Sequence, residues 1–349
     1  MTDITFKWKD GLPMRSQLAK YISGFNKISS DQKRVVIRRF FSACWSIFRV
    51  ALLIGLAYVL LYPLLYMITM AIRDKNDMFD VTVNWIPRNI TSYTLGRVWK
   101  AMEYPKTLLN TIFIVGLCSI VSACTCSLAG YGFARFKFKG QKIMFAVVIF
   151  TIIVPQSFYN MPTYINFRYF NFLGILDLYN LLSGSSAAVN LLNTRWTMIL
   201  PALFGAGIRA GLYIYLFRQF FKSMPKELEE AAYIDGCGYL QTFYRVMVPA
   251  SLSVFVTVFL FAFVWYWNDY QISGLLLGSD NMTLSSALSV INNLTYSLEI
   301  SEGNHAVDTV RMALDNQGAC LLVIAPLVLL YIFLQKYFVE SIERTGLVE

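Results

Sequence analysis

The sequence predicts an all-α integral membrane protein with six transmembrane helices and both termini in the cytoplasm. Of its 349 residues, 56% are hydrophobic and only 15% are charged, and the mean hydropathy is +0.52. A soluble domain usually carries about a quarter charged residues. Five uncharged runs of about 20 residues or more can each cross about 30 Å of hydrocarbon as a helix, and a sixth run contains one arginine.

The first predicted span lies within residues 44–72 and follows a basic tail of residues 1–43. We expect an uncleaved anchor, because no Ala-x-Ala site follows the first apolar run. A helix in the tail, with Ser30 as a candidate cap, would suit the membrane surface; alternatively, the basic residues only fix the orientation. Residues 73–106 are predicted to form an extracytoplasmic loop.

The remaining five spans belong to a predicted core domain of residues 107–342. They cover about 107–134, 143–167, 196–217, 246–268 and 316–335. Residues 176–194 are too polar to enter lipid unaided, so we expect an external loop helix there. Residues 343–349 then form the cytoplasmic C-terminus.

The distribution of basic residues predicts the orientation. With the N-terminus inside, the cytoplasmic segments hold nineteen Lys and Arg residues and the opposite side holds nine. This bias places both termini and the loop of residues 222–249 in the cytoplasm. It also accounts for the net charge of +9, because the basic residues lie where lipid headgroups are. No nucleic-acid partner is therefore expected.

The cytoplasmic loop is predicted to contain a helix-turn-helix elbow. Pro225 suits the first turn of a helix over 225–235, and Gly236 suits a left-handed stop. Acidic residues in the first turn complement the positive end of the helix dipole. A second helix, over about 239–247, is expected to end at Pro249, where the next span begins.

One face of the first elbow helix is a candidate docking surface. Residues at spacings of three and four share this face, namely Leu228, Ala231, Ala232 and Asp235. The adjacent alanines leave a shallow surface that another protein can approach closely. Periodicity alone favours equally an amphipathic connector that rests on its own bundle.

The motif Glu230-Ala231-Ala232, followed by Gly236 and Pro249, resembles the EAA loop of permease subunits in bacterial ABC importers. The family pattern is Glu-Ala-Ala, three residues, Gly, nine residues and Ile-x-Leu-Pro. Two valines stand here for the Ile and the Leu. In that family the loop forms a coupling helix that sits in a cleft of the ATPase subunit.

Other stretches resemble the carbohydrate-uptake branch of the family, the permeases of maltose-type importers. They are residues 128–156, 216–236, 263–271 and 334–342. The similarity covers about Thr107 to Ile342. Two features depart from the family pattern: the long tail before the first span, and an apparent insertion at 181–195.

The resemblance implies a site and a set of partners. The residues that would contact the ATPase are Glu229, Glu230, Ala231, Ala232, Asp235 and Gly236. The implied partners are two ABC ATPase subunits, a second permease subunit expected to be a different chain, an extracytoplasmic solute-binding protein, and a sugar, expected to be an oligosaccharide. The localisation is the bacterial plasma membrane.

No nucleotide site is predicted on this chain. The sequence contains no GxxxxGK[ST] motif, so ATP and Mg are expected on the partner subunits. We expect no catalytic residue, no metal site and no cofactor here.

Prolines and polar residues within the spans indicate a route through the bundle. A proline such as Pro155 leaves a backbone carbonyl without its helical partner, and inside a membrane that carbonyl must bond to protein or to water in a pathway. The predicted pathway residues are Gln156, Tyr159, Asn160, Arg209, Trp267, Asn268 and Asp269. Aromatic rings suit the apolar face of a sugar, and amide or carboxylate groups suit its hydroxyl groups. For Trp265 and Trp267, anchoring at the membrane interface is the alternative, and only one of the two can face inward easily.

Arg209 is the unusual residue of the predicted fourth span. An arginine inside a span costs about 2.5–3.5 kcal/mol on insertion scales, so it should face a partner or water. Gly207 and Gly211 give a GxxxG spacing that favours close helix approach. The arginine then contacts substrate or the second permease, or it forms a structural ion pair.

Two other functions remain open at this stage. An ABC importer permease for a non-sugar solute, such as an amino acid or a polyamine, would have the same coupling loop. An ion-coupled secondary transporter is disfavoured, because the spans contain almost no acidic residues and no inverted repeat is visible. A membrane enzyme is weaker still, since no span holds a nucleophile with a base or a metal cluster.

Overall fold

The computed structural model describes residues 30–80, 82, 85–171, 174–184, 189–301, 303 and 308–346. Within these ranges every regular element is a helix, and the only β-type contacts are two isolated bridges, so the predicted all-α class is confirmed. The chain divides into two units, residues 1–66 and 67–349.

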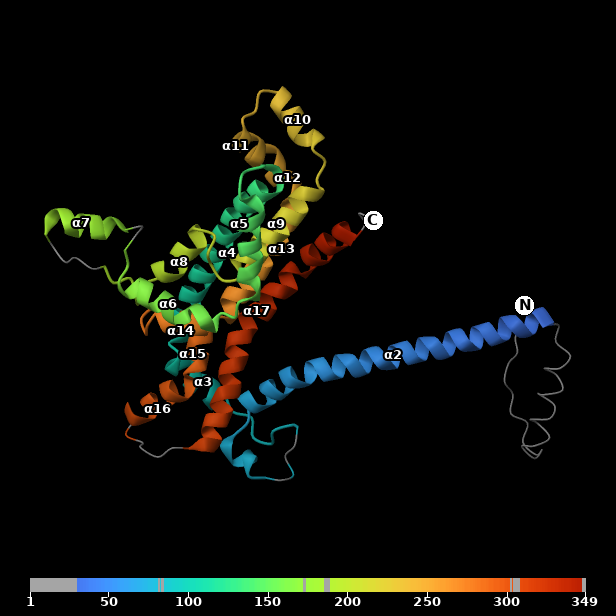
Figure 1. Ribbon diagram of the computed structural model, residues 1–349. Coiled ribbons are helices and arrows are strands. Elements are labelled where there is room, and N and C mark those ends of the chain that lie inside the picture. Colours follow the sequence, from blue (N-terminus) through green and yellow to red (C-terminus); the bar gives the residue numbers. More distant parts are fainter. Residues whose placement is uncertain are drawn as a thin grey trace, which may run out of the picture. The chain divides into compact units, whose positions relative to one another are not determined.

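The helices carry the labels of Figure 1. Their bounds are α2 (Ser30–Ala71), η1 (Lys75–Met78), α3 (Tyr93–Ala101), α4 (Tyr104–Arg135), α5 (Gln141–Ile153), α6 (Ser157–Arg168), α7 (Ile175–Ser183), α8 (Trp196–Leu203), α9 (Ala210–Ser223), α10 (Glu227–Ile234), α11 (Tyr239–Thr242), η3 (Phe243–Met247), α12 (Val248–Ala250), α13 (Leu252–Asn268), α14 (Gln271–Leu276), α15 (Leu284–Ser289), α16 (Ile291–Ser301) and α17 (Thr309–Gly346). The element η1 is a 3-10 helix and η3 is a π-helix.

Three of these helices are long and apolar enough to cross a membrane. They are residues 38–71 of α2, the whole of α4, and residues 309–333 of α17. Two bent pairs raise the number in the described residues to as many as five: α5 with α6, bent by 106°, and residues 239–250 with α13, bent by 81°. The count of six crossings and the orientation of the termini stay predictions.

The bend between α5 and α6 follows from Pro155. Steric contact with a proline ring disfavours helical geometry in the preceding residue. Val154 is accordingly extended, with φ −66° and ψ 123°, and it ends α5. The predicted span 143–167 is therefore two short helices rather than one rod.

The predicted span 196–217 is also interrupted. Helix α8 ends at Leu203, and α9 begins only at Ala210. In the break Gly205 has φ 65°, which glycine adopts without steric cost, and Arg209 has φ 58°, which is uncommon for a residue with a Cβ. The break places the arginine at a helix start instead of in the middle of a span.

The structure changes one expectation for the tail. Helix α2 begins at Ser30 and continues without interruption to Ala71, so the described part of the tail forms no separate surface helix. The loop helix expected in 176–194 is present as α7, and its external position stays a prediction. Residues 1–29 of the tail, 185–188 of the apparent insertion and 347–349 of the C-terminus lie outside the described residues.

Helix α4 lies at the centre of the second unit, where it packs against α8, α9 and α13. Since lipid is as apolar as a leucine side chain, helices in a membrane associate through close packing, which small residues allow. A Cβ at Gly130 of α4 would lie 2.6 Å from the Phe217 Cβ of α9, so only glycine permits this approach. Buried aromatic side chains of α9, including Phe217 and Phe221, fill the rest of the contact.

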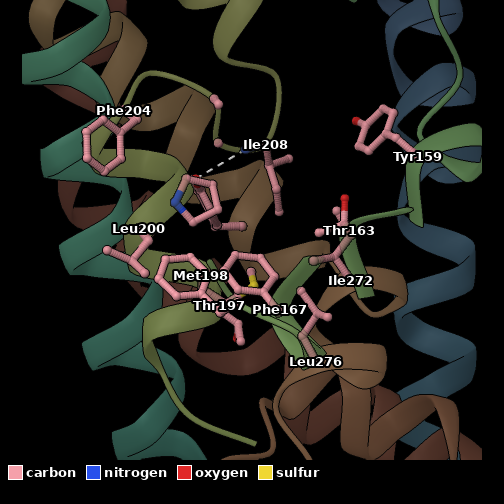
Figure 2. Close-up of a pocket in the computed structure, with 15 residues that line it drawn as sticks. Tyr159, Thr163, Phe167, Thr197, Met198, Leu200, Phe204, Ile208, Ile272 and Leu276 are labelled. Carbon is pink, nitrogen blue, oxygen red and sulfur yellow. Dashed lines mark hydrogen bonds between the residues drawn. The ribbon is translucent and has the colours of Figure 1, made fainter. Parts of the chain in front are cut away.

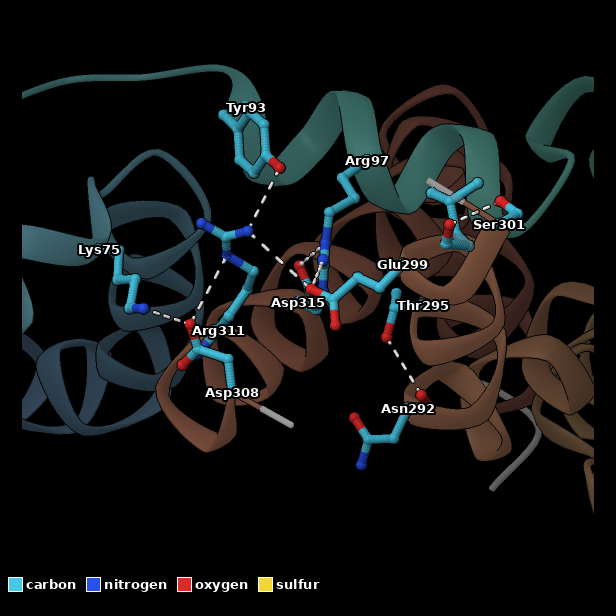
Figure 3. A network of polar contacts seen from close by, with 11 residues as sticks. Lys75, Tyr93, Arg97, Asn292, Thr295, Glu299, Ser301, Asp308, Arg311 and Asp315 are labelled. Carbon is cyan, nitrogen blue, oxygen red and sulfur yellow. Dashed lines mark hydrogen bonds and ion pairs between the residues drawn. The ribbon is translucent and has the colours of Figure 1, made fainter. Parts of the chain in front are cut away.

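A buried ion-pair network joins α3, α16 and α17 at the end of the second unit that is opposite α10 (Figures 1 and 3). The Arg97 guanidinium contacts the carboxylates of Glu299 and Asp315, and its Nε donates to Asp315 Oδ1 at 3.3 Å. Arg311 Nη1 lies 3.9 Å from Glu299 Oε1. No sequence pattern predicts this network, because Arg97 lies 202 and 218 residues from its two partners.

Candidate functional site: the elbow and the cavities beside the helix breaks

Helix α10 is the first helix of the elbow. Its first turn carries three glutamates, which complement the positive end of the helix dipole. Gly236 has φ 83° and donates its N–H to the Tyr233 carbonyl at 3.0 Å, while Cys237 donates to the Ala232 carbonyl at 2.9 Å. These two bonds form a Schellman C-cap, so the left-handed stop predicted at Gly236 is confirmed.

One residue of the predicted docking face of α10 is buried instead of exposed. Leu228, Ala231 and Asp235 are exposed, together with Glu230, but Ala232 is only 6% exposed and packs against the chain itself. The exposed surface extends instead over apolar residues that the sequence analysis did not select. They are Ile234, Tyr239, Leu240 and Tyr244. The buried face rests on the chain's own bundle, and docking on the exposed face stays a prediction.

Glu229 anchors the buried face of α10. Its Oε2 lies 3.2 Å from Nε of Arg135, at the end of α4, and the two side chains are only 9% and 7% exposed. Arg135 Nη2 also donates to the Met224 carbonyl at 2.9 Å, just before the elbow begins. Glu229 therefore bonds within this chain, which differs from its predicted role as a contact to another subunit.

Aromatic rings hold the rest of the elbow on the ends of α4 and α9. The Tyr131 ring lies 5.0 Å from the Phe243 ring, and the Phe136 ring lies 5.6 Å from the Tyr239 ring, both measured between centroids. Edge-to-face and tilted pairs at such distances are the arrangements that aromatic side chains favour. The elbow is thus packed on its own bundle.

The second elbow helix covers the predicted residues 239–247 but ends later than predicted, at residue 250. Residues 239–242 are α-helical, 243–247 form a π-helix, and Pro249 lies inside the short α12. A proline is tolerated in the first turn of a helix, because an N–H at that position would have no acceptor within the helix. The break into α13 therefore occurs at Ser251, two residues after the proline.

A largely apolar cavity of about 320 Å³ lies beside the α8–α9 break (Figure 2). Tyr159 borders it from α6, across from Phe204 and Ile208 of the break. The Tyr266 hydroxyl accepts a hydrogen bond from the Ile208 N–H at 3.2 Å, and a Cβ at Gly207 would lie 2.2 Å from that hydroxyl. This close packing fixes the course of the break.

A second cavity, of about 570 Å³, lies between α5 and the start of α9, and we call it the arginine cavity. Its lining includes Gln156, Tyr159, Arg209 and Trp265. The Arg209 guanidinium carbon lies 4.3 Å from the centroid of the Trp265 ring. No ion pair of Arg209 is found in the described residues, and a cation–π contact takes the place of the structural ion pair that was one of the predicted alternatives.

Gly211 brings α9 close to α5 at this cavity. A Cβ at Gly211 would lie 2.3 Å from Thr151 Oγ1 and 3.0 Å from the Val148 carbonyl oxygen. The close helix approach predicted from the glycine spacing is present at this position.

A smaller pocket of about 170 Å³, which we call the acidic pocket, adjoins the arginine cavity. Gln156 and Trp265 line both of them. Gln156 Nε2 donates to Asp269 Oδ1 at 3.3 Å, which joins α6 to the end of α13. The other carboxylate oxygen of Asp269 accepts from the Ser273 N–H at 2.7 Å.

The remaining predicted pathway residues have different surroundings. Asn268 lines the acidic pocket, and its amide donates to the Val264 carbonyl at 2.9 Å. Asn160 is half-buried, and its Oδ1 has no hydrogen-bond partner among the described residues. Trp267 is only 3% exposed and donates to the Val323 carbonyl at 3.2 Å, so it lies in the core and Trp265 takes its place at the cavities.

In the described part of the chain, no group of three or more His, Cys, Asp or Glu side chains could hold a metal ion. The site therefore consists of two parts. One is the exposed face of the elbow, and the other is a set of cavities lined by aromatic rings, three amides, one carboxylate and one arginine.

The chain is similar to known transport proteins over most of its length. Residues 126–344 match the family described as "Binding-protein-dependent transport system inner membrane component". The melibiose/raffinose/stachyose import permease protein MelC of Bacillus subtilis is 27% identical over 282 residues, which cover 80% of this chain and 88% of MelC. The maltodextrin transport system permease protein MalD of Streptococcus pneumoniae is 27% identical over 296 residues, which cover 84% of this chain and 92% of MalD.

The fold is similar to that of a solved structure. This is the crystal structure of a bacterial ABC transporter involved in the import of the acidic polysaccharide alginate, with a TM-score of 0.64 at 22% identity. The match covers 89% of this chain and 99% of that chain.

Proposed function

The chain belongs to the family of binding-protein-dependent transport system inner membrane components, and from this premise we propose that it forms one half of the translocation pathway of an ATP-driven sugar importer. It is a multi-pass protein of the plasma membrane and the permease subunit of an ABC importer. The other half of the pathway is a second permease subunit, which we expect to be a different chain.

The substrate that we propose is an oligosaccharide. MelC is named as a permease for melibiose, raffinose and stachyose import and MalD as one for maltodextrin transport, and each aligns with more than four fifths of its own length. Tyr159 and Trp265 offer aromatic surface to the cavities, and Gln156 and Asn268 offer amide groups. Ligand sites commonly combine apolar lining with a few polar groups in this way. An extracytoplasmic solute-binding protein delivers the sugar.

ATP hydrolysis takes place, in this proposal, on two separate ABC ATPase subunits, which hold ATP and Mg. The exposed face of α10 is the contact with one of them, through Glu230, Ala231 and Asp235, and the fixed stop at Gly236 keeps that face in place. Apolar side chains such as Ile234, which is 86% exposed, are costly in water and favour burial against a partner.

The same geometry supports alternating access. The elbow is continuous with α13 through α12 and is joined to α4 through the Glu229–Arg135 ion pair. A displacement of α10 would therefore move both helices, and α4 packs against α8, α9 and α13 around the broken spans. A rigid-body movement of this kind would change which side of the pathway is open.

The proposed topology has six crossings, with the elbow and both termini in the cytoplasm. In the second unit α10 lies at the end opposite α3 and α16, which is consistent with two membrane sides (Figure 1). The interrupted pairs α5–α6 and α8–α9 border the cavities, as expected for irregular backbone at membrane depth.

The exposed Glu230-Ala231 face of α10 is the observation that carries the proposal, because it leaves the family motif free to bind a partner. The test is ATP-dependent uptake of labelled oligosaccharides into proteoliposomes that hold this chain with the subunits that co-purify with it. Uptake should require ATP, the ATPase subunits and the binding protein. Uptake that persists without any ATPase subunit would overturn the proposal in favour of an ion-coupled transporter.

A further inference from the structure

We propose that the pathway of this importer takes an acidic oligosaccharide, one that carries the carboxylate of a uronic acid, and that Arg209 binds this carboxylate. The inference rests on the proposed function, since it names the substrate class of the same pathway. It begins from the charge of the arginine cavity. Among the residues that line this cavity in the described part of the chain, Arg209 is the one charged side chain.

The backbone presents Arg209 to the cavity at a conformational cost. Its φ of 58° and ψ of 21° are left-handed, a region that residues with a Cβ rarely adopt. Such geometry persists where the surroundings enforce it, and it is concentrated at functional sites. Here the Tyr266 hydroxyl holds the preceding residue, Ile208, through its N–H.

The Trp265 ring orients the guanidinium without consuming its hydrogen bonds. A guanidinium over an aromatic face keeps the donors along its edge available, and this edge matches the two oxygens of a carboxylate. Arg209 is exposed, so a ligand can reach these donors. Tyr159 and Gln156 line the same cavity and add neutral groups for sugar hydroxyls.

The nearby acidic pocket does not supply the missing negative charge. Asp269 accepts hydrogen bonds from the Ser273 N–H at 2.7 Å, the Ile272 N–H at 3.3 Å and Gln156 Nε2 at 3.3 Å. These donors satisfy its oxygens, and the described residues show no ion pair between Asp269 and Arg209. One guanidinium also matches the single charge of a carboxylate better than a phosphate, which carries about −1.5 to −2 at pH 7.

The experiment compares two substrate pools in proteoliposomes that contain the whole importer. One pool holds di- to tetrasaccharides of galacturonic and mannuronic acid, and the other is the same pool after chemical reduction of its carboxyl groups to neutral sugars. The wild type should take up the acidic pool in preference. Arg209→Gln should reduce acidic uptake by about ten- to a hundred-fold, the effect expected for one lost charge-assisted hydrogen-bonding pair, with uptake of the neutral pool little changed.

Two variants complete the test. Arg209→Lys keeps the charge and should retain part of the preference for the acidic pool. Arg168→Gln is the matched control, because Arg168 is also an exposed arginine beside an aromatic ring, that of Tyr169, but it lines none of the three cavities. It should leave the preference unchanged.

Several results would overturn the inference. Preferred uptake of neutral sugars by the wild type, with a ratio that Arg209→Gln does not alter, would refute it while leaving the sugar importer intact. An equal loss for both pools, or a failure of the variant to assemble, would assign Arg209 to the interface with the second permease. Failure of every sugar in either pool would count against the proposed function itself.

Discussion

Arg135 at the end of α4 and Glu229 of α10 form an ion pair with Nε and Oε2 3.2 Å apart, buried beneath the elbow. The pair connects the proposed docking helix directly to a helix that is long enough to cross the membrane. The elbow is thus joined to the bundle at two places, by this contact and by the chain itself where α12 leads into α13. Motion of α10 is expected to reach both α4 and α13.

Glu229→Gln should uncouple ATP hydrolysis from transport. Removal of one partner of a buried ion pair leaves the other charge uncompensated, a change that costs about 3–5 kcal/mol. We expect a lower melting temperature and roughly tenfold slower uptake at near-normal ATPase activity. The measurement is the ratio of sugar transported to ATP hydrolysed in proteoliposomes.

Two further variants separate coupling from folding in that experiment. Glu227→Gln removes an exposed glutamate from the same first turn and should leave the ratio unchanged. The double variant Arg135→Glu with Glu229→Arg restores opposite charges and should recover part of the coupling. A normal ratio in Glu229→Gln would show that the pair does not transmit the motion.

Glu230→Lys should abolish transport while the chain remains folded in the membrane. Glu230 is exposed on the face proposed to bind the ATPase, so the substitution reverses a charge at the interface without disturbing the packed side of α10. The measurement is recovery of ATPase subunits with the tagged chain, with Asp177→Lys on the exposed part of α7 as the control. Normal sugar uptake by Glu230→Lys would contradict the assignment of the elbow.

Gly236→Ala should destabilise the elbow through the backbone alone. Gly236 has φ 83°, and a left-handed residue with a Cβ costs about 1–2 kcal/mol. No atom lies within 4 Å of the Cβ that the substitution adds, so contact with neighbours plays no part. Gly238→Ala is the matched control, because Gly238 has an equally open surrounding but φ −75°. We expect the first variant to lower the melting temperature and the second to leave it unchanged. Equal effects of the two would exclude the backbone explanation.

The sequence was sufficient to predict those features that depend on local chemistry. The all-α class, the left-handed stop at Gly236 and the close approach at Gly211 each follow from residues within a few positions of one another. The helix breaks were predicted less well. Pro249 was expected to end the second elbow helix, but the chain incorporates it in α12 after a π-helix.

The contacts across the fold could not be predicted from the sequence. Nothing in the pattern links Arg135 to Glu229 or Arg97 to Asp315, because each pair depends on how distant helices pack. The orientation of the two tryptophans is a similar case. The sequence does not distinguish Trp265 from Trp267, since both are tryptophans near the end of the same helix. Only the packing of Trp267 against α17 shows that Trp265 is the one beside the cavities.

Asp77 should make the segment of residues 73–106 sensitive to acid. The Asn89 backbone N–H, which donates to Asp77 Oδ2 at 2.9 Å, holds the pKa of this carboxyl below its usual value near 3.8. Because the folded-state pKa is the lower one, the stabilisation is complete above the unfolded pKa and is lost as the pH falls through the folded pKa. Asp77→Asn should therefore lower the melting temperature at pH 7, and the difference from the wild type should disappear in strong acid. Thermal unfolding of the full chain in detergent, with Asp177→Asn as the control, measures this; a difference independent of pH would contradict it.

Gly130→Ala should destabilise the bundle, although alanine favours helices more than glycine does. The added Cβ would lie 2.6 Å from the Phe217 Cβ and 3.0 Å from the Arg218 backbone nitrogen, so α9 would have to move away from α4. Overpacking of this kind costs typically about 1–3 kcal/mol, which exceeds the gain in helix propensity of about 1 kcal/mol. Gly132→Ala, two residues later on α4, adds a Cβ with no atom within 4 Å and should be neutral or slightly stabilising. The melting temperature should therefore fall for Gly130→Ala and stay or rise slightly for Gly132→Ala. A Gly130→Ala variant at least as stable as the wild type would show that α4 and α9 are not held at this distance.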